Sequence, residues 1–563
     1  MVNDATVDKL ITEGRAALRT GDAAGARTAF EQIPDRSTRG DVIEGLARVS
    51  YLEMNFAQAI DEWERAYAAH RDSGDHVGAI RVARTVAYMY LAIVGDWAVG
   101  SGWLARAKTL LGDSPDSPER GWVSLNVGMF EADRATKAVR FREALAVARQ
   151  LADTDLEFVT LAYLGASLVH SDRNEEGMML LDEALAAVAG SDVEDFCVLE
   201  EIFCQLFSAC EHAHDVRRAD QWIRIGEMIA ERRKLPAVSA FCRTHYGGIL
   251  TAAGRWPEAD AALTEAVRLW GLGQKSLRVG ALTRLADLRV RQGRIEEAQQ
   301  LLEGFDATTS PDVARPLAAI HLANGQTALA TDVLERALEQ VDPLSTTAAP
   351  LLALLVDVHL GADLIEDART AAGKLAQCAE LHTGHYLSAV AALAQGRVCL
   401  ASGTGDPQAC LREALAEFAK AQMPMEVAHS RLAIANALLT ERPEVAMAEA
   451  RAALDEFDRL RAARHVDAAA AVLRSLGAKS TSAKTSGSTK TSGMRGSGNL
   501  LSKREAEVLD LIGHGLSNPE ISERLFISRK TVEHHVSNVL SKLGLRSRGQ
   551  AAAYSTRAKP GDQ

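Results

Sequence analysis

Five polar side chains near the C-terminus have the types and the spacing of a surface that contacts nucleic acid. They recur on one side of a predicted helix: Lys530, Glu533, His534, Ser537 and Asn538. An ammonium group attracts a phosphate as a point charge. Carboxylate, imidazole, hydroxyl and amide groups can pair with base edges. The chemistry available here is therefore recognition by charge and hydrogen bonds.

Short helices must position these side chains. Ser517 precedes Glu520 by three residues, which is the spacing of a capping box. Pro519 lies just inside the same start, where its missing N–H costs nothing. We predict helices at about 519–525 and 529–543. The three residues between them are too few for anything but a tight turn, as in a helix-turn-helix.

This helix-turn-helix, at about 517–536, has an apolar seam that would face a core. Its apolar residues recur at intervals of three, four and seven: Ile521, Leu525, Val532, Val536, Val539, Leu540 and Leu543. Similar start signals at Ser502 and Ser547 predict one further helix on each side. We therefore expect a four-helix domain.

The stretch from Leu501 to Arg548 resembles the LuxR-type DNA-binding domain of bacterial regulators. The resemblance is carried by residues spread over all four helices: Leu501, Ser502, Arg504, Glu505, Glu507, Val508, Leu509, Gly515, Ser517, Asn518, Glu520, Ile521, Leu525, Ile527, Ser528, Thr531, Val532, His535, Lys542, Leu543, Gly544, Ser547 and Arg548. It implies that the third helix enters the major groove of DNA. It also implies that the fourth helix, at about 547–558, forms a homodimer that reads an inverted repeat.

The same resemblance assigns roles by position. Three residues would face the bases: Glu533, His534 and Ser537. Six others would bind phosphates and fix the register: Arg529, Lys530, Thr531, Asn538, Lys542 and Arg548. Glu533 departs from the basic residue that is commoner there, and a carboxylate near phosphate makes sense if it accepts from the amino group of cytosine. The preferred DNA sequence is left open by this departure.

Charge is divided unevenly along the chain. The 563 residues include 63 Lys or Arg and 75 Asp or Glu, a net charge of −12. Residues from 478 onward hold 14 of the basic and 7 of the acidic residues, so this part is +7 and the first 477 residues are −19. The positive field that holds phosphates therefore coincides with the helix-turn-helix.

Small residues twelve positions apart recur along the first part of the chain. The pairs are Gly14 and Ala26, Ala47 and Ala59, Gly165 and Gly177, Gly247 and Ala259, Ala286 and Ala298, and Ala318 and Ala330. A large apolar residue follows each pair by four positions: Phe30, Trp63, Leu181, Leu263, Leu302 and Leu334. Turn signals such as Gly21-Asp22 and Gly254-Arg255 lie within the pairs. Small residues let antiparallel helices approach closely, and the large one fills the groove between neighbouring hairpins.

This pattern resembles a degenerate tetratricopeptide repeat. About a dozen helical hairpins would form an all-α superhelix with a concave groove over residues 1–477. Residues 478–499 contain four basic and no acidic residues and almost nothing apolar, so we expect a flexible linker there. The DNA-binding domain would occupy 500–563.

Other chemistries are not indicated. No GxxxxGK[ST] loop occurs, so the ATPase module of many long LuxR-type regulators is not predicted. No receiver domain and no catalytic constellation is recognisable. The seven cysteines are an odd number without CxxC, as expected of core residues in a reduced protein. We predict no enzyme activity and no cofactor.

Two histidine-rich segments have to be weighed as metal ligands. They are Glu211-His212-Ala213-His214-Asp215 and His382-Thr383-Gly384-His385, with Cys204, Cys210 and Cys242 as conceivable partners. Zinc needs four well-placed ligands, and such short patterns arise easily by chance. We favour solvated turns over a metal site.

These features predict a transcriptional regulator that reads double-stranded DNA. The array would sense a protein, peptide or small-molecule effector, or mediate oligomerisation. The alternative is an interaction scaffold whose helix-turn-helix does not read DNA, although a scaffold has no need of the charge division. The start MVNDATVDKL lacks a signal peptide, and no apolar run approaches the roughly 18 residues of a membrane span. We expect a cytoplasmic protein without membrane contact, associated with the nucleoid when bound to DNA.

Overall fold

The computed structural model of the chain describes residues 4–34, 36–112, 117–171, 173–233, 240–270, 275–305, 313–382, 384–477, 503–525, 529, 532, 535–536, 539–540, 545 and 548–557. Within these residues the regular structure is helical, and no β-strand is present. The chain separates into two compact units, Met1–Ser480 and Thr481–Gln563.

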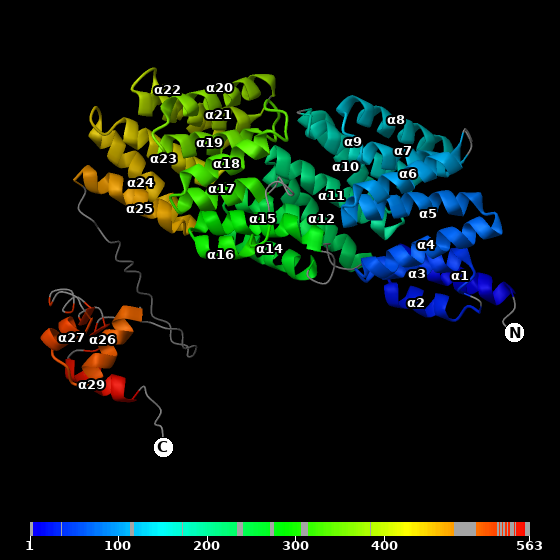
Figure 1. The fold of residues 1–563 in the computed structure, drawn as a ribbon, viewed down its shortest axis with the longest axis horizontal. Coiled ribbons are helices and arrows are strands. Elements are labelled where there is room, and N and C mark those ends of the chain that lie inside the picture. Colours follow the sequence, from blue (N-terminus) through cyan, green and yellow to red (C-terminus); the bar gives the residue numbers. More distant parts are fainter. Residues whose placement is uncertain are drawn as a thin grey trace. The chain divides into compact units, whose positions relative to one another are not determined.

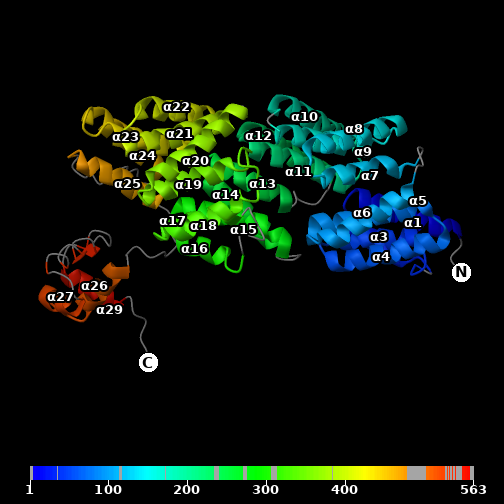
Figure 2. The same cartoon turned by 45° about the horizontal axis from the view of Figure 1, so that its top comes forward.

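The first unit is an array of paired helices that lie side by side (Figures 1 and 2). Its first part contains α1 (Asp4–Arg19), α2 (Ala23–Glu31), α3 (Gly40–Leu52), α4 (Phe56–Ser73), α5 (His76–Tyr88), the π-helix η1 (Met89–Val94), α6 (Trp97–Leu111), α7 (Glu119–Met129), α8 (Arg134–Leu151), α9 (Thr154–Val169), α10 (Asn174–Gly190), α11 (Phe196–Ala213) and α12 (Val216–Arg233). Its second part contains α13 (Ala240–Ala252), α14 (Trp256–Trp270), α15 (Lys275–Gln292), α16 (Ile295–Leu301), α17 (Ala314–Ala323), α18 (Thr327–Leu338), α19 (Ala349–Gly361), α20 (Ile365–Leu381), α21 (His385–Ser402), α22 (Pro407–Lys420), α23 (Pro424–Ala437), α24 (Pro443–Leu460) and α25 (Ala463–Ser475). Successive helices from α1 to α24 pack as hairpins, which confirms the prediction of about a dozen.

Small residues set the distance between paired helices. A β-carbon built on Gly177 of α10 would lie 2.4 Å from the carbonyl oxygen of Gly165 on α9. A β-carbon on Gly14 would lie 2.7 Å from the ring of Phe30. The remaining predicted small and large residues are buried: Ala26, Ala47, Ala59, Trp63, Leu181, Ala259, Leu263, Ala286, Ala298, Leu302, Ala318, Ala330 and Leu334. The predicted contact pattern is therefore confirmed.

Glycine and aspartate make the turns where the sequence places them. Gly21 has a φ of 73° and Gly254 a φ of 72°, values that favour glycine because it has no β-carbon. Asp22 then caps α2, since its carboxylate accepts the backbone N–H of Gly25 at 2.9 Å. The turn and the next helix start are thus encoded together.

The array also brings together helices that are far apart in sequence. Trp256 at the start of α14 shares a buried core with Phe457 and Leu460 of α24. Arg291 on α15 donates to Glu426 on α23 at 2.8 Å. Repeats of a solenoid ordinarily contact only their neighbours. The contact of α13 to α15 with α23 to α25 therefore joins two separate parts of the superhelix.

One apolar stretch passes the length and composition test for a membrane span. Among the described residues this is His76–Val94, of which 56% is buried within the array. Val82, Val86 and Met89 share a core with Trp270. The prediction that no apolar run approaches this length is therefore wrong, although the stretch packs as a core helix.

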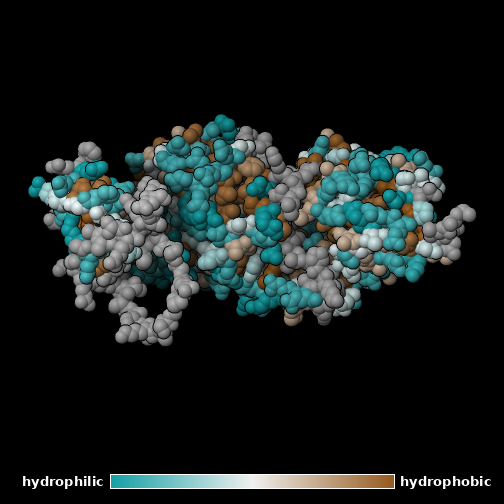
Figure 3. All heavy atoms as spheres, turned by 90° about the horizontal axis from the view of Figure 1, so that it is seen from below, coloured by the Kyte–Doolittle hydropathy of each residue, from teal (hydrophilic) through white to brown (hydrophobic). Residues whose placement is uncertain are grey.

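Polar residues cover most of the face shown in Figure 3, and apolar residues form separate patches between them.

A buried ion pair joins neighbouring hairpins near the N-terminus. Both carboxylate oxygens of Glu44 on α3 accept from Arg81 on α5 at 2.7 Å, and one lies 3.3 Å from Nε2 of His70. Burial alone would raise the pKa of Glu44, but the hydrogen bonds and charges of Arg81 and His70 outweigh it and lower that pKa to about 2. The ionised carboxylate therefore stabilises the folded array.

Gly177→Ala should lower the free energy of unfolding by about 1 to 3 kcal/mol, because its new methyl group meets backbone rather than a movable side chain. Urea denaturation of the full chain, followed by circular dichroism, measures this. The control is Gly102→Ala on α6, where a β-carbon meets no atom within 4 Å. It should be neutral or stabilising by up to about 1 kcal/mol. Equal midpoints for the two variants would show that contact at Gly177 does not limit the helix spacing.

Glu44→Gln should cost about 3 kcal/mol at pH 7, from a pKa of about 2 in the folded state against 4.5 for the free carboxyl. A carboxyl whose pKa is lowered by folding stabilises above pH 4.5. This contribution is lost as the pH falls through about 2, so the difference from the wild type should shrink toward zero. Thermal melts of both proteins across this pH range test it. Glu13→Gln, at an exposed residue paired with Lys9, should change the melting temperature little. A loss of stability in Glu44→Gln that does not depend on pH would contradict this explanation.

Candidate nucleic-acid interface

The second unit is a small helical domain around one core. Its labelled helices are α26 (Lys503–Gly513), α27 (Asn518–Leu525) and α29 (Arg548–Arg557). The buried core residues are Val508, Leu509, Ile512, Ile521, Val532, Val539 and Ala551. Leu525, Val536 and Leu540 pack against them. The predicted apolar seam is confirmed for these residues, and its last member, Leu543, lies outside the described residues.

The third helix of the motif follows α27. Its described residues, all helical, are Arg529, Val532, His535, Val536, Val539 and Leu540. Val532 and Val539 are fully buried, whereas Arg529 is exposed. The helix therefore has a core face and an outer face, as the sequence periodicity predicts.

The start of α27 is fixed by the predicted capping box. The backbone N–H and the hydroxyl of Ser517 both donate to Glu520 Oε2 at 2.6 Å. These two hydrogen bonds lower the pKa of Glu520. Here the Ser517 hydroxyl donates a hydrogen bond to the Glu520 carboxylate. In the usual capping box the hydroxyl instead accepts one from a backbone N–H. Ser517 and Glu520 nevertheless hold the first turn of α27 in place.

Two arginines hold α27 at both ends. Arg504 on α26 donates to the carbonyl oxygen of Leu525, the last residue of α27, at 2.6 Å. Arg548 donates to Asn518 Oδ1 at 2.6 Å and to the carbonyl oxygen of Leu516. Sequence reasoning missed these contacts, and the only signal was that both arginines belong to the family pattern. Because its ends are fixed, α27 sets the direction in which the third helix leaves the turn.

The described residues include two of the nine predicted DNA contacts. Arg529 is exposed at the beginning of the third helix, where a phosphate can reach it. Arg548 is half-buried and uses guanidinium N–H groups within the domain. The other predicted contacts lie outside the described residues: Lys530, Thr531, Glu533, His534, Ser537, Asn538 and Lys542. The framework that would present them is described, and their side chains are not.

The prediction of a solvated turn is wrong for the first histidine-rich segment, whereas in the second Gly384 and His385 are exposed. His214 ends α11, and its ring centroid lies 4.3 Å from that of Tyr386. Burial lowers the pKa of His212 to about 3, and both histidines line a cavity. His382 hydrogen-bonds to the carbonyl oxygen of Leu344 at 2.8 Å. In the described part of the chain, no group of three or more His, Cys, Asp or Glu side chains could hold a metal ion.

The seven cysteines lie on the helices of the array as thiols rather than disulfides. Five are buried, and Cys197 and Cys410 are half-buried. The Sγ atoms of Cys204 and Cys242 lie 3.5 Å apart in the core between α11 and α13. The cysteines therefore pack as small core residues, as predicted.

Comparison with known proteins assigns the C-terminal part. The family described as bacterial regulatory proteins, luxR family, matches residues 499–555. The transcriptional regulatory protein LnrK of Bacillus subtilis (strain 168) is 56% identical over 57 residues, which are 10% of this chain and 26% of that protein. The oxygen regulatory protein NreC of Staphylococcus aureus (strain JH9) is 48% identical over 60 residues, 11% of this chain and 28% of that protein. The chain thus spans only about a quarter of the length of these relatives.

One solved structure is similar over most of the chain. It is a chain in the crystal structure of the APC/C hetero-tetramer Cut9-Hcn1, with 14% identity and a TM-score of 0.33. The match covers 84% of this chain and 96% of that one. A TM-score this low does not establish a common fold. The tetratricopeptide-like character of the array rests on its own hairpins and small-residue contacts.

Fold and family agree over the same C-terminal residues. The core, the capping box at Ser517 and the fixed ends of α27 form a helix-turn-helix framework within the matched stretch. The match covers about a tenth of the chain, so it identifies this part alone. Residues 499–555 are a DNA-binding domain of the LuxR regulatory family.

Proposed function

We propose that the protein is a sequence-specific transcriptional regulator that reads DNA through its LuxR-type domain and receives its signal through the helical array. The observation that carries this proposal is the helix-turn-helix framework within the family match at 499–555. The exposed Arg529 at the start of the third helix supports it, because the N-terminal residues of a recognition helix lie nearest the DNA.

The third helix would lie in the major groove. Glu533, His534 and Ser537 would face base edges, while Arg529 and Lys530 would bind phosphates on either side. Thr531, Asn538, Lys542 and Arg548 would add backbone contacts. Arg548 would do so with the guanidinium N–H groups that it does not use on Leu516 and Asn518.

Two copies of the domain would bind an inverted repeat. The fourth helix, α29, is the surface that we assign to the homodimer, and Tyr554 on it is 43% exposed. A large aromatic side chain is a common anchor of a protein interface. A two-fold dimer would place its recognition helices about one helical turn of DNA apart.

The array would serve as the sensing part. Its −19 charge makes it an unsuitable partner for DNA, whereas the +7 of the C-terminal part suits phosphates.

Binding to DNA would place the protein in the cytoplasm at the nucleoid. The printed names of LnrK and NreC describe regulatory proteins, and they support a regulatory role by analogy.

Lys530→Ala should weaken binding of the full chain to every duplex. It should also reduce the slope of log affinity against log salt concentration by about one unit, because binding then releases one counterion fewer from the DNA. Fluorescence anisotropy with a labelled duplex of random sequence over a series of salt concentrations measures this. Lys9→Ala, which removes an exposed charge from the array, should leave the slope unchanged. An altered preference among sequences with an intact slope would reassign Lys530 to base reading. Failure of the wild type to bind at any salt would favour the scaffold.

Glu533→Ala should relax discrimination at one base pair by roughly 1 to 3 kcal/mol, because a carboxylate that accepts from cytosine penalises the other bases. Competition among duplexes that differ at single positions measures the change. Glu533→Gln keeps the size of the side chain and separates the effect of charge from that of shape. A binding profile unchanged in both variants would remove Glu533 from the base-reading set.

A further inference from the structure

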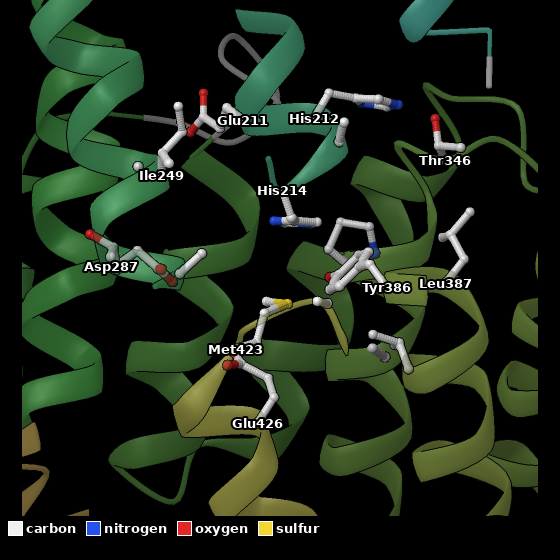
Figure 4. A pocket seen from close by; sticks show the side chains of 18 of the residues that line it. Glu211, His212, His214, Ile249, Asp287, Thr346, Tyr386, Leu387, Met423 and Glu426 are labelled. Atoms are coloured by element: carbon white, nitrogen blue, oxygen red, sulfur yellow. The ribbon is translucent and has the colours of Figure 1, made fainter. Parts of the chain in front are cut away.

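The array forms a partly open cavity of about 1640 Å³ (Figure 4). Helices between α10 and α25 contribute to its lining. The ion pair of Arg291 with Glu426 crosses from α15 to α23 beside it. Ligand pockets usually occupy about 300 to 1,000 Å³. The joining of two parts of the superhelix therefore creates a space that can hold an organic ligand.

Charges on the cavity wall are matched in pairs. Glu211 accepts from Arg284 through both oxygens at 2.7 Å. Asp287 accepts from Arg291 at 2.9 Å and also from Arg315. Burial would raise the pKa of both carboxyl groups, but the neighbouring guanidinium groups lower each pKa to about 2. Around Arg291 the ionised groups therefore neutralise one another.

Histidines add hydrogen-bonding capacity without charge. Seven of the 15 in the chain line the cavity: His170, His212, His214, His245, His385, His429 and His465. Burial lowers the pKa of His212 to about 3 and that of His465 to about 4. At neutral pH each of these two rings is uncharged and has one donor and one acceptor nitrogen. A polar ligand without charge would find partners here.

Three buried polar atoms of lining residues have no hydrogen-bond partner within the described part of the chain. They are Oε2 of Glu426, Oγ1 of Thr283 and Oδ1 of Asn174. The carboxylate of Glu426 is otherwise engaged, since its Oε1 accepts from Arg291 at 2.8 Å. A buried polar atom left unpaired costs about 1 to 3 kcal/mol. A ligand that donates a hydrogen bond to Oε2 of Glu426 would recover this loss.

An apolar wall lies beside these polar groups. Tyr386 and Leu387 begin α21, and the ring of Tyr386 packs against His214 inside the cavity (Figure 4). Met423 lies between Tyr386 and Glu426 in the same view. Aromatic and aliphatic side chains of this kind supply most of the contact area in small-molecule sites.

We propose that this cavity binds an uncharged organic ligand that combines an N–H donor for Glu426 with an aromatic or aliphatic body for the wall at Tyr386. Beside Glu426, where the carboxylates are paired with Arg291 and Arg315, an ion would lose its hydration without meeting an unpaired opposite charge. An amide or indole N–H supplies the donor without that loss. The binding site stands on the geometry of the array, and its assignment as the effector site rests on the proposed function.

The test uses the full chain and three probes with one indole body. N-acetyltryptophan amide is uncharged and has N–H donors, N-acetyltryptophan is an anion, and tryptamine is a cation. Saturation-transfer NMR titrations should show saturable binding of the amide, about tenfold tighter than binding of either ion. Glu426→Gln should weaken binding of the amide by about tenfold, as expected for loss of one hydrogen bond. Glu449→Gln, at a carboxylate on α24 that accepts from Arg431 at 2.7 Å outside the lining, should leave binding unchanged.

Three results would overturn the proposal: no saturable binding of the amide by the wild type, equal binding of the three probes, or equal binding by Glu426→Gln and the wild type. Thr283→Val removes the unpartnered Oγ1 atom of Thr283 and provides an independent variant. We expect it to lower the affinity for the amide a few fold. Circular dichroism establishes that each variant is folded. DNA binding is measured on the same samples, so that its failure alongside intact probe binding would count against the proposed function only.

Discussion

The architecture of the array depends on how closely its paired helices approach. Gly165 and Gly177 bring α9 and α10 together until backbone meets backbone, and the same small-residue contact recurs in other hairpins. The large residue that follows each pair then packs in the groove beside it. A close and repeated contact gives each hairpin a defined rotation relative to the next. The accumulated rotation brings α15 to α23, where Arg291 meets Glu426 and the cavity forms.

The DNA-binding domain meets a different constraint, because a small core must fix one helix accurately. Seven buried residues form that core in the described part of the domain. Local hydrogen bonds supplement it: Ser517 with Glu520 at the start of α27, and Arg504 and Arg548 on its two ends. Side chains that read bases must be held by rigid surroundings. Ser517, Glu520, Arg504 and Arg548 therefore serve the framework that positions the third helix.

Prediction from sequence succeeded where the pattern is local. The twelve-residue spacing that placed Gly177 near Gly165 and the capping spacing at Ser517 concern neighbours in the chain, and both were confirmed. The contact of Trp256 with Phe457 was not predictable, because it depends on rotation accumulated over many hairpins. A contact between residues far apart in the chain also explains His214, whose position at a helix end suggested a solvated turn but whose ring packs against Tyr386 in the cavity. Among the predicted DNA contacts, the hydrogen bond of Arg548 to Asn518 inside the domain could not be inferred from the charge of Arg548.

Selection of binding sites from a pool of random duplexes is the measurement that most directly decides whether the protein reads DNA. It should be made with the full chain and, in parallel, with residues 478–563. If the LuxR-type domain reads bases through its third helix and dimerises, the pool should become enriched in an inverted repeat whose half-sites lie about one helical turn apart. Enrichment by the short chain alone would mean that the array restrains the domain until its partner or ligand arrives. Enrichment by neither chain would contradict sequence-specific regulation and favour an interaction scaffold.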